Sequence, residues 1–155
     1  MSEPVTQVPA HVLEYLAAHR TLSLATASAD GSPHASTMLY ANDGSNLFIW
    51  TRRQTTTAKH LEENPRVSFT IDDAGGDWHK SSGVQGTGQA SVVEDGGEVV
   101  NLIGLFADKF AQSVGEESAA GISFYKITTT QLRYIGGSSD GAAEPVGAEF
   151  SEEDL

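Results

Sequence analysis

Residues 52–59, with the sequence RRQTTTAK, combine cationic and hydroxyl side chains in a chain that is otherwise strongly acidic. The arginines and Lys59 could form charge-assisted hydrogen bonds with an anion, and the threonine hydroxyls could donate others. The segment follows a predicted strand that ends near Trp50 and Thr51, and a predicted helix begins among its threonines. Because a helix N-terminus offers unpaired N–H groups and a positive dipole end, the pattern suits a phosphate group.

The same residues also have a purely structural interpretation. Thr55 or Thr57 could simply cap the helix. The two arginines could pair with some of the many acidic side chains, and Lys59 could lie in solvent beside Glu63, four residues later. From the residues alone, neither interpretation is favoured.

Other familiar chemistry is missing from the sequence. There is no cysteine, which excludes disulfides, thiolate zinc sites and cysteine nucleophiles. The sequence has neither the nucleophile-elbow pattern of α/β-hydrolases nor a dinucleotide-binding fingerprint. A metal site assembled by the fold stays open, but surface or core positions are the expected ones for the histidines, since none has the spacing of a helical metal motif. The histidines are His11, His19, His34, His60 and His79.

The charge balance limits the classes of partner. The chain of 155 residues has 21 acidic residues against 9 lysines and arginines, a formal net charge of −12. Nucleic acids and anionic membranes attract basic surfaces, so we expect neither as a partner. With no membrane-length apolar stretch and no signal-peptide pattern, a cytoplasmic protein is expected. Residues 137–155 carry six acids and no base, which predicts a flexible tail after one domain at 1–136.

Hydrophobic periodicity predicts the elements that would hold the cationic segment. Apolar residues at helical spacing after Pro9 indicate an N-terminal helix. Strands are predicted at 21–28, 33–41 and 46–51, separated by the turn signals DG and NDGS. Strands so close in the sequence should form an antiparallel meander.

The second half of the chain continues this mixed pattern. A strand at 82–94 contains three glycines, which indicates a bend or a bulge. A helix at 97–113 would place five large apolar side chains on one face. Six or seven strands with two or three helices indicate an α+β fold built on an antiparallel barrel or sandwich. The other predicted elements are a threonine-capped helix at 55–64 and strands at 66–72, 121–127 and 131–137.

The order of three segments resembles the pyridoxamine 5'-phosphate oxidase-like family of FMN-binding split barrels. These segments are TLSLATASADGSPHASTMLYANDGSNLFIWT, TAKHLEENPRVSFTID and SGVQGTGQASVV, and the resemblance covers roughly residues 10–135. It implies a six-stranded split β-barrel that forms a homodimer with two FMN sites at the dimer interface.

The resemblance also implies which residues contact the cofactor. The second strand would lie along the flavin ring, and the third strand and the loop after it would approach the phosphate. Gln85 would lie near the flavin, with packing in its strand as an equal alternative. The implied cofactor-binding residues are Ser36, Thr37, Met38, Trp50, Thr51, Arg53, Thr56, Thr57, Lys59 and Gln85.

Two features depart from the family pattern. Pyridoxamine phosphate oxidases have an Arg-Lys pair where this chain has Thr56-Thr57, so Arg52, Arg53 or Lys59 would have to supply the charge. The C-terminal tryptophan and arginine that those enzymes use are also missing, because no tryptophan follows Trp78. Vitamin B6 oxidation is therefore not the expected activity.

The expected function is that of a flavin-dependent oxidoreductase that transfers hydride or electrons between FMN and a small molecule. The cofactor would supply the chemistry, so no pair of catalytic acid and base residues is needed. Two alternatives stay open: a deazaflavin coenzyme in place of FMN, and a non-catalytic flavin- or haem-binding protein. Stacking surface could come from aromatic side chains, with core packing as their commoner role. These are Tyr40, Trp50, Phe69 and Trp78.

Overall fold

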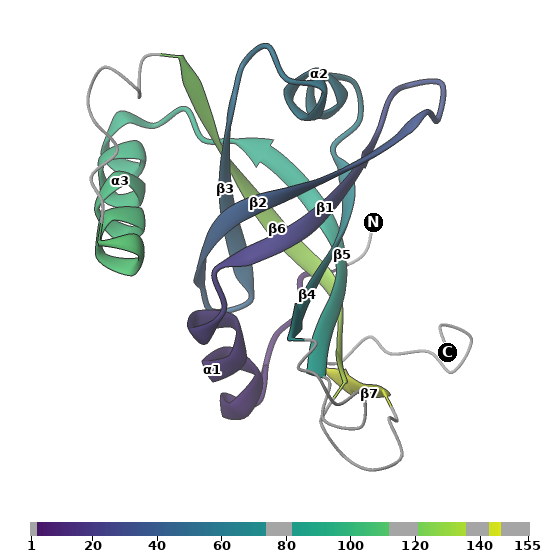
Figure 1. The fold of residues 1–155 in the computed structure, drawn as a ribbon, viewed down its shortest axis with the longest axis vertical. Coiled ribbons are helices and arrows are strands. Elements are labelled where there is room, and N and C mark those ends of the chain that lie inside the picture. Colours follow the sequence, from purple (N-terminus) through teal and green to yellow (C-terminus); the bar gives the residue numbers. More distant parts are fainter. Residues whose placement is uncertain (1–2, 74–81, 112–120, 136–142, 147–155) are drawn as a thin grey trace.

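A closed antiparallel barrel forms the body of the protein. The computed structural model describes residues 3–73, 82–111, 121–135 and 143–146. The strands are β1 (Thr21–Ala27), β2 (Pro33–Asp43), β3 (Asn46–Arg52), β4 (Arg66–Asp73), β5 (Ser82–Val92), β6 (Ile122–Ile135) and β7 (Ala143–Val146), and the helices are α1 (Ala10–Ala18), α2 (Thr56–Glu63) and α3 (Gly96–Phe110). The sheet order is β3-β2-β1-β4-β5-β6-β7, and β3 also pairs with β6. That pairing closes β1 to β6 into a six-stranded barrel (Figure 1), so the predicted α+β barrel is confirmed.

Pairing along the chain agrees with the predicted order at its start and differs near its end. The first three strands form the expected antiparallel meander. The prediction of two separate strands at 121–127 and 131–137 is wrong, because β6 runs without interruption from Ile122 to Ile135. Its three central threonines are β-branched and favour an extended backbone, so they continue the strand. Part of the predicted tail, β7, pairs with the second half of β6.

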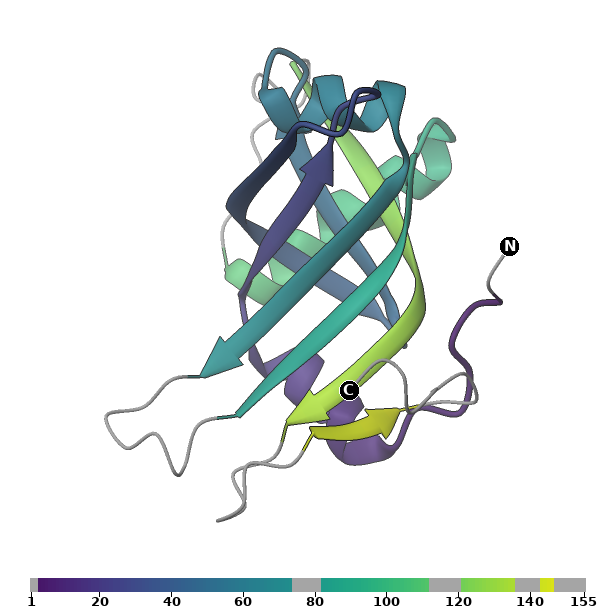
Figure 2. The ribbon, with the colours of Figure 1, turned by 90° about the vertical axis from the view of Figure 1, so that its right-hand side faces the viewer.

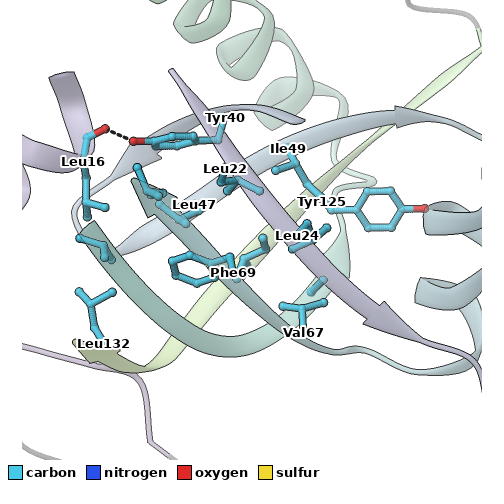
Figure 3. Close-up of a cluster of buried hydrophobic side chains, with 14 of the residues drawn as sticks. Leu16, Leu22, Leu24, Tyr40, Leu47, Ile49, Val67, Phe69, Tyr125 and Leu132 are labelled. Carbon is cyan, nitrogen blue, oxygen red and sulfur yellow. Dashed lines mark hydrogen bonds between the residues drawn. The ribbon is translucent and has the colours of Figure 1, made fainter. Parts of the chain in front are cut away.

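The barrel interior is filled by alternate residues of each strand. Burial alternates in β1 and β4, as expected for strands with one face on a core. Tyr40 is fully buried, and its hydroxyl donates a hydrogen bond of 2.5 Å to the carbonyl oxygen of Leu16 in α1 (Figure 3). Burial raises the pKa of Tyr40, so this phenol stays a donor. Phe69 also lies in this core, which fits the packing role expected for both aromatics.

The three helices cover different parts of the barrel. In Figure 1, α1 lies near one end of the barrel and α2 near the other, while α3 stands beside it. Pro9 precedes α1 as predicted, and Val12 and Leu16 enter the barrel core. The apolar face predicted for α3 is confirmed, because Leu102 and Phe106 bury themselves in a second cluster with residues of β3 and β6.

A bulge between β5 and β6 bends the sheet where the sequence predicted irregularity. The register shifts between Thr87 and Gly88, and Thr130 is the extra residue on β6. A Cβ atom on Gly88 would lie 2.3 Å from the carbonyl oxygen of Thr128, so the two strands approach too closely there for any larger residue. Bulges of this kind increase the local twist and help a sheet to close.

One face of the barrel carries no helix. Figure 2 shows β1, β4, β5 and β6 toward the viewer, with no helix in front of them. The register places Thr37, Ser23, Thr70 and Gln85 in one row across β2, β1, β4 and β5, and all four are exposed. We call the outward side of β2, β1, β4, β5 and β6 the outer sheet face. Among the described residues, no helix is long and apolar enough to cross a membrane.

Candidate functional site

Thr55 builds the corner between β3 and α2. Its hydroxyl oxygen accepts a hydrogen bond from the Ala58 N–H at 3.1 Å, which is the N-cap geometry that the sequence predicted. The hydroxyls of Thr55 and Thr51 lie 2.8 Å apart, and the Thr55 hydroxyl also donates to the Arg52 carbonyl oxygen at 2.9 Å. Thr51 is therefore bound within the corner, and its hydroxyl has protein partners.

A second hydroxyl contact joins α2 to β2. The hydroxyls of Ser36 and Thr57 lie 3.3 Å apart, although the two residues are 21 positions apart in the sequence. Thr57 is buried and Ser36 is half-buried, so the contact holds the first turn of the helix against the strand. The structure thus brings together the strand expected to carry the flavin ring and the helix expected to receive the phosphate.

Thr56 and Lys59 form the solvent-facing side of this helix start. Both are exposed, and three residues apart they share one face of α2. Apart from the Ala58 N–H, which Thr55 caps, the first N–H groups of α2 have no partner within the helix. They lie beside the exposed Thr56 hydroxyl and the exposed Lys59 ammonium group. Among the described residues, Lys59 forms no ion pair, and Glu63 accepts a hydrogen bond from the Ala29 N–H at 2.8 Å. Chemically, this face could hold a phosphate.

Arg53 lies on the flank of α2 that faces β6. Its Nε donates to the hydroxyl of Ser123 on β6 at 3.4 Å, and its backbone N–H donates to the Gly121 carbonyl. The side chain borders a cavity of about 300 Å³ that Glu62 and Tyr125 also line. Burial raises the pKa of Tyr125, and the Glu62 carboxylate adds to this shift. Arg53 and Ser36 therefore lie on different flanks of α2, so the predicted site residues do not form a single cluster.

The remaining predicted residues are spread over the barrel. On β2, Thr37 points to the outer sheet face, whereas Ser36 and Met38 point the other way, since neighbouring residues of a strand alternate. Trp50 packs against the cluster beneath α3. Gln85 is exposed on the outer sheet face, three strand spacings from Thr37, which is about 14 Å. Trp78 falls outside the described residues.

The fold brings two histidines together that the sequence spacing did not connect. The rings of His34 and His60 meet edge to face with centroids 5.9 Å apart, and His60 Nδ1 lies 3.0 Å from the Thr26 hydroxyl. Within the described ranges, no cluster of three or more histidine, aspartate or glutamate side chains could hold a metal ion. His79 lies outside these ranges. The contacts of His60 with His34 and Thr26 pack the last turn of α2 against β2 and β1.

A polar hollow lies at the α2 end of the outer sheet face, and no sequence motif indicates it. It has a volume of about 680 Å³ and includes Asn64, Arg66, Gln89 and Gln131 in its lining. These residues come from the α2–β4 connection and from three strands, so their spacing in the sequence carries no motif. The only sign of this surface in the sequence is a polar residue at every second position of β4 and β5.

Comparison of the sequence with protein families gives one match. The model of the family described as pyridoxamine 5'-phosphate oxidase matches residues 8–136, which include α1, the whole barrel and all the predicted site residues. No curated protein matches the sequence.

Solved structures with the same fold have different printed descriptions. A putative pyridoxamine 5'-phosphate oxidase from Listeria innocua is 26% identical, with a TM-score of 0.65 over 81% of this chain and 95% of that one. The haem storage protein HutZ from Vibrio cholerae is 21% identical, with a TM-score of 0.67 over 82% of this chain and 94% of that one. A haem-binding protein from Mycobacterium smegmatis is 21% identical, with a TM-score of 0.74 over 92% of this chain and 60% of that one. At 21% identity the likeness concerns the fold.

Proposed function

Since the chain belongs to the pyridoxamine 5'-phosphate oxidase family, we propose that it binds FMN and acts as a flavin-dependent oxidoreductase on a small molecule. The observation that carries the proposal is the Ser36–Thr57 contact, which holds the first turn of α2 against β2. A single ligand could then place its phosphate at that helix start and its flavin ring along β2. A small electron donor or acceptor and a cytoplasmic location belong to the same proposal.

The exposed groups at the start of α2 fit the phosphate of FMN. Thr56 offers a hydroxyl, Lys59 offers a positive charge, and the helix offers unpaired N–H groups. Thr51 and Thr57 would act indirectly, because their hydroxyls already hold the corner and the helix in place. Lys59 would replace part of the charge that the Arg-Lys pair supplies in pyridoxamine phosphate oxidases.

FMN, when bound, supplies a ring that accepts and donates hydride. The chain would hold this ring by its position along β2, where Thr37 presents a hydroxyl on the outer sheet face. We propose that two copies of the chain pair through this face, which no described helix covers and which leaves Leu39 39% exposed. The partner would then exclude water from the ring.

A non-catalytic haem-binding function is the second candidate. The named haem-binding and haem storage proteins support it, because they have the same fold as this chain. A deazaflavin coenzyme is a third ligand for the same fold. The absorbance spectrum of the purified protein separates haem from flavin, because haem gives a Soret band and oxidised flavin absorbs in the blue.

The decisive experiment compares FMN with riboflavin, which lacks the phosphate. We expect wild-type protein to bind FMN more tightly in a fluorescence-quenching titration. Lys59→Glu should weaken FMN binding about tenfold or more, since a charge-assisted hydrogen bond contributes about 1.5–3 kcal/mol, and should change riboflavin binding little.

Arg20→Glu is the matched control, because it makes the same charge change on an exposed residue that follows α1, at the other end of the barrel from α2. Equal loss of FMN and riboflavin binding in Lys59→Glu would contradict the phosphate assignment. If wild-type protein bound haem and no flavin, the second candidate would replace the first. If the wild-type protein binds FMN, reduction of the bound FMN by NADH or NADPH tests the oxidoreductase activity itself.

A further inference from the structure

The polar hollow on the outer sheet face lies across four neighbouring strands of the barrel. Ala25, Ser68, Thr87 and Gln131 form one register row across β1, β4, β5 and β6. The β6 bulge falls beside this row, and the Thr130 hydroxyl donates to the Thr87 carbonyl oxygen at 3.3 Å there. At about 680 Å³, the hollow has the size of a site for a small molecule.

Internal hydrogen bonds engage the amide oxygens of two lining residues and leave their NH₂ groups as donors. The Asn64 side-chain oxygen accepts from the Arg66 backbone N–H at 3.1 Å, so its NH₂ group is left to donate elsewhere. The Gln131 side-chain oxygen likewise accepts from the Thr87 hydroxyl at 3.1 Å, which leaves its NH₂ group as a donor. Both acceptors are thus occupied by the protein, whereas both pairs of amide donors are available.

Among the described residues that line the hollow, the one charged side chain is a cation. Arg66 lies opposite Gln89 in the pairing of β4 with β5, and both are exposed. Among the described residues that line the hollow, none carries a carboxylate, although the whole chain has 21 acidic residues and 9 basic ones. A guanidinium and two amide donors with no competing carboxylate are the groups that recognise an oxyanion.

We propose that this hollow binds a small polar molecule that carries an oxyanion, either a phosphate monoester or a carboxylate. Arg66 pairs with the oxyanion, while the amide groups of Asn64, Gln89 and Gln131 bind the polar body of the ligand. The site is separate from the helix start at Thr56 and Lys59, neither of which lines the hollow. The proposal does not rest on flavin binding.

NMR of the full chain tests the proposal, with the side-chain NH₂ signals of Asn64, Gln89 and Gln131 as reporters. The probes are glucose 6-phosphate, gluconate and uncharged glucose. We expect saturable shifts of these signals with glucose 6-phosphate or with gluconate, which identifies the kind of oxyanion, and none with glucose. Arg66→Gln should weaken the bound probe about tenfold or more, while Lys59→Gln should leave its affinity unchanged.

Three results would overturn the proposal. The first is the absence of saturable shifts with either charged probe, or equal shifts with glucose. The second is an unchanged affinity in Arg66→Gln, provided that its backbone spectrum shows the wild-type fold. The third is displacement of the bound probe by FMN in the wild-type protein, together with loss of this displacement in Lys59→Glu. The hollow would then be part of the flavin site.

Discussion

At the scale of single residues, Lys109 holds an amine in an unusual place. Its Nζ atom is buried, has no hydrogen-bond partner among the described residues, and lies 4.0 Å from the centre of the Tyr40 ring. Burial, and then repulsion from Arg20, lower the pKa of Lys109 to about 8. A favourable contact between the ammonium group and the aromatic ring offsets only part of the cost of burying the charge.

Lys109→Met should therefore stabilise the protein at neutral pH. Below about pH 8 the lysine is charged in both the folded and unfolded states, so the full cost of burial is present. Between about pH 8 and pH 10.5 the unfolded state binds more protons, so wild-type stability gains from this group as pH rises. We expect the variant to gain about 1–2 kcal/mol in free energy of unfolding at pH 7 and much less at pH 10, measured by urea denaturation. A gain that did not depend on pH would show that packing, and not charge, is responsible.

Sequence reasoning reached some residues of the candidate site and missed others for a physical reason. The Thr55 cap follows from local chain geometry, which is why it could be predicted. The direction of Arg53 depends on Ser123, 70 residues away, and the burial of Lys109 depends on Tyr40. Contacts across such separations are set by the closed barrel, and no local pattern encodes them.

At the scale of elements, the caps of α2 and α3 form a natural pair for comparison. Thr55 caps α2, and Asp95 caps α3 by accepting from the Glu98 N–H at 2.9 Å. Thr55→Ala and Asp95→Ala should each lower the free energy of unfolding by about 1 kcal/mol. Only Thr55→Ala should also weaken FMN binding, because α2 and not α3 carries the proposed phosphate site. Equal FMN affinities in the two variants would separate the α2 cap from the cofactor.

Most elements were predictable because their hydrophobic period is clear. The alternation of β4 and the apolar face of α3 both appear in the structure as predicted. The prediction of two strands in place of β6 is wrong, because Thr128, Thr129 and Thr130 continue the strand. Thr129 is in fact buried, and its hydroxyl donates to the Ser45 carbonyl oxygen at 2.6 Å, a contact that tertiary structure alone provides.

At the scale of the whole molecule, the proposed pairing through the outer sheet face can be tested with a single added charge. Ser23 lies in the exposed row of this face, and Asn101 is an exposed polar residue on α3. Ser23→Arg should convert the proposed dimer to a monomer in sedimentation experiments, because a charged arginine would lie where the two copies meet. Asn101→Arg adds the same charge on a different surface and should leave the dimer intact. A wild-type monomer at all concentrations would remove the basis for pairing through this face.

Strand β6 has a further consequence for how the protein is made. It pairs with β5, β3 and β7, so both edges of the sheet formed by β1 to β5 stay open until β6 arrives. A ribosome adds roughly 5–20 residues per second, so the 43 residues from Val92 to Ile135 take roughly 2–9 s. During this interval the nascent chain exposes two unpaired strand edges and a core that still lacks the apolar side chains of β6. Such edges and apolar surfaces are the features that chaperones bind and that lead to aggregation. We therefore expect the yield of the native protein in cells to depend on β6, the last strand of the barrel to be synthesised.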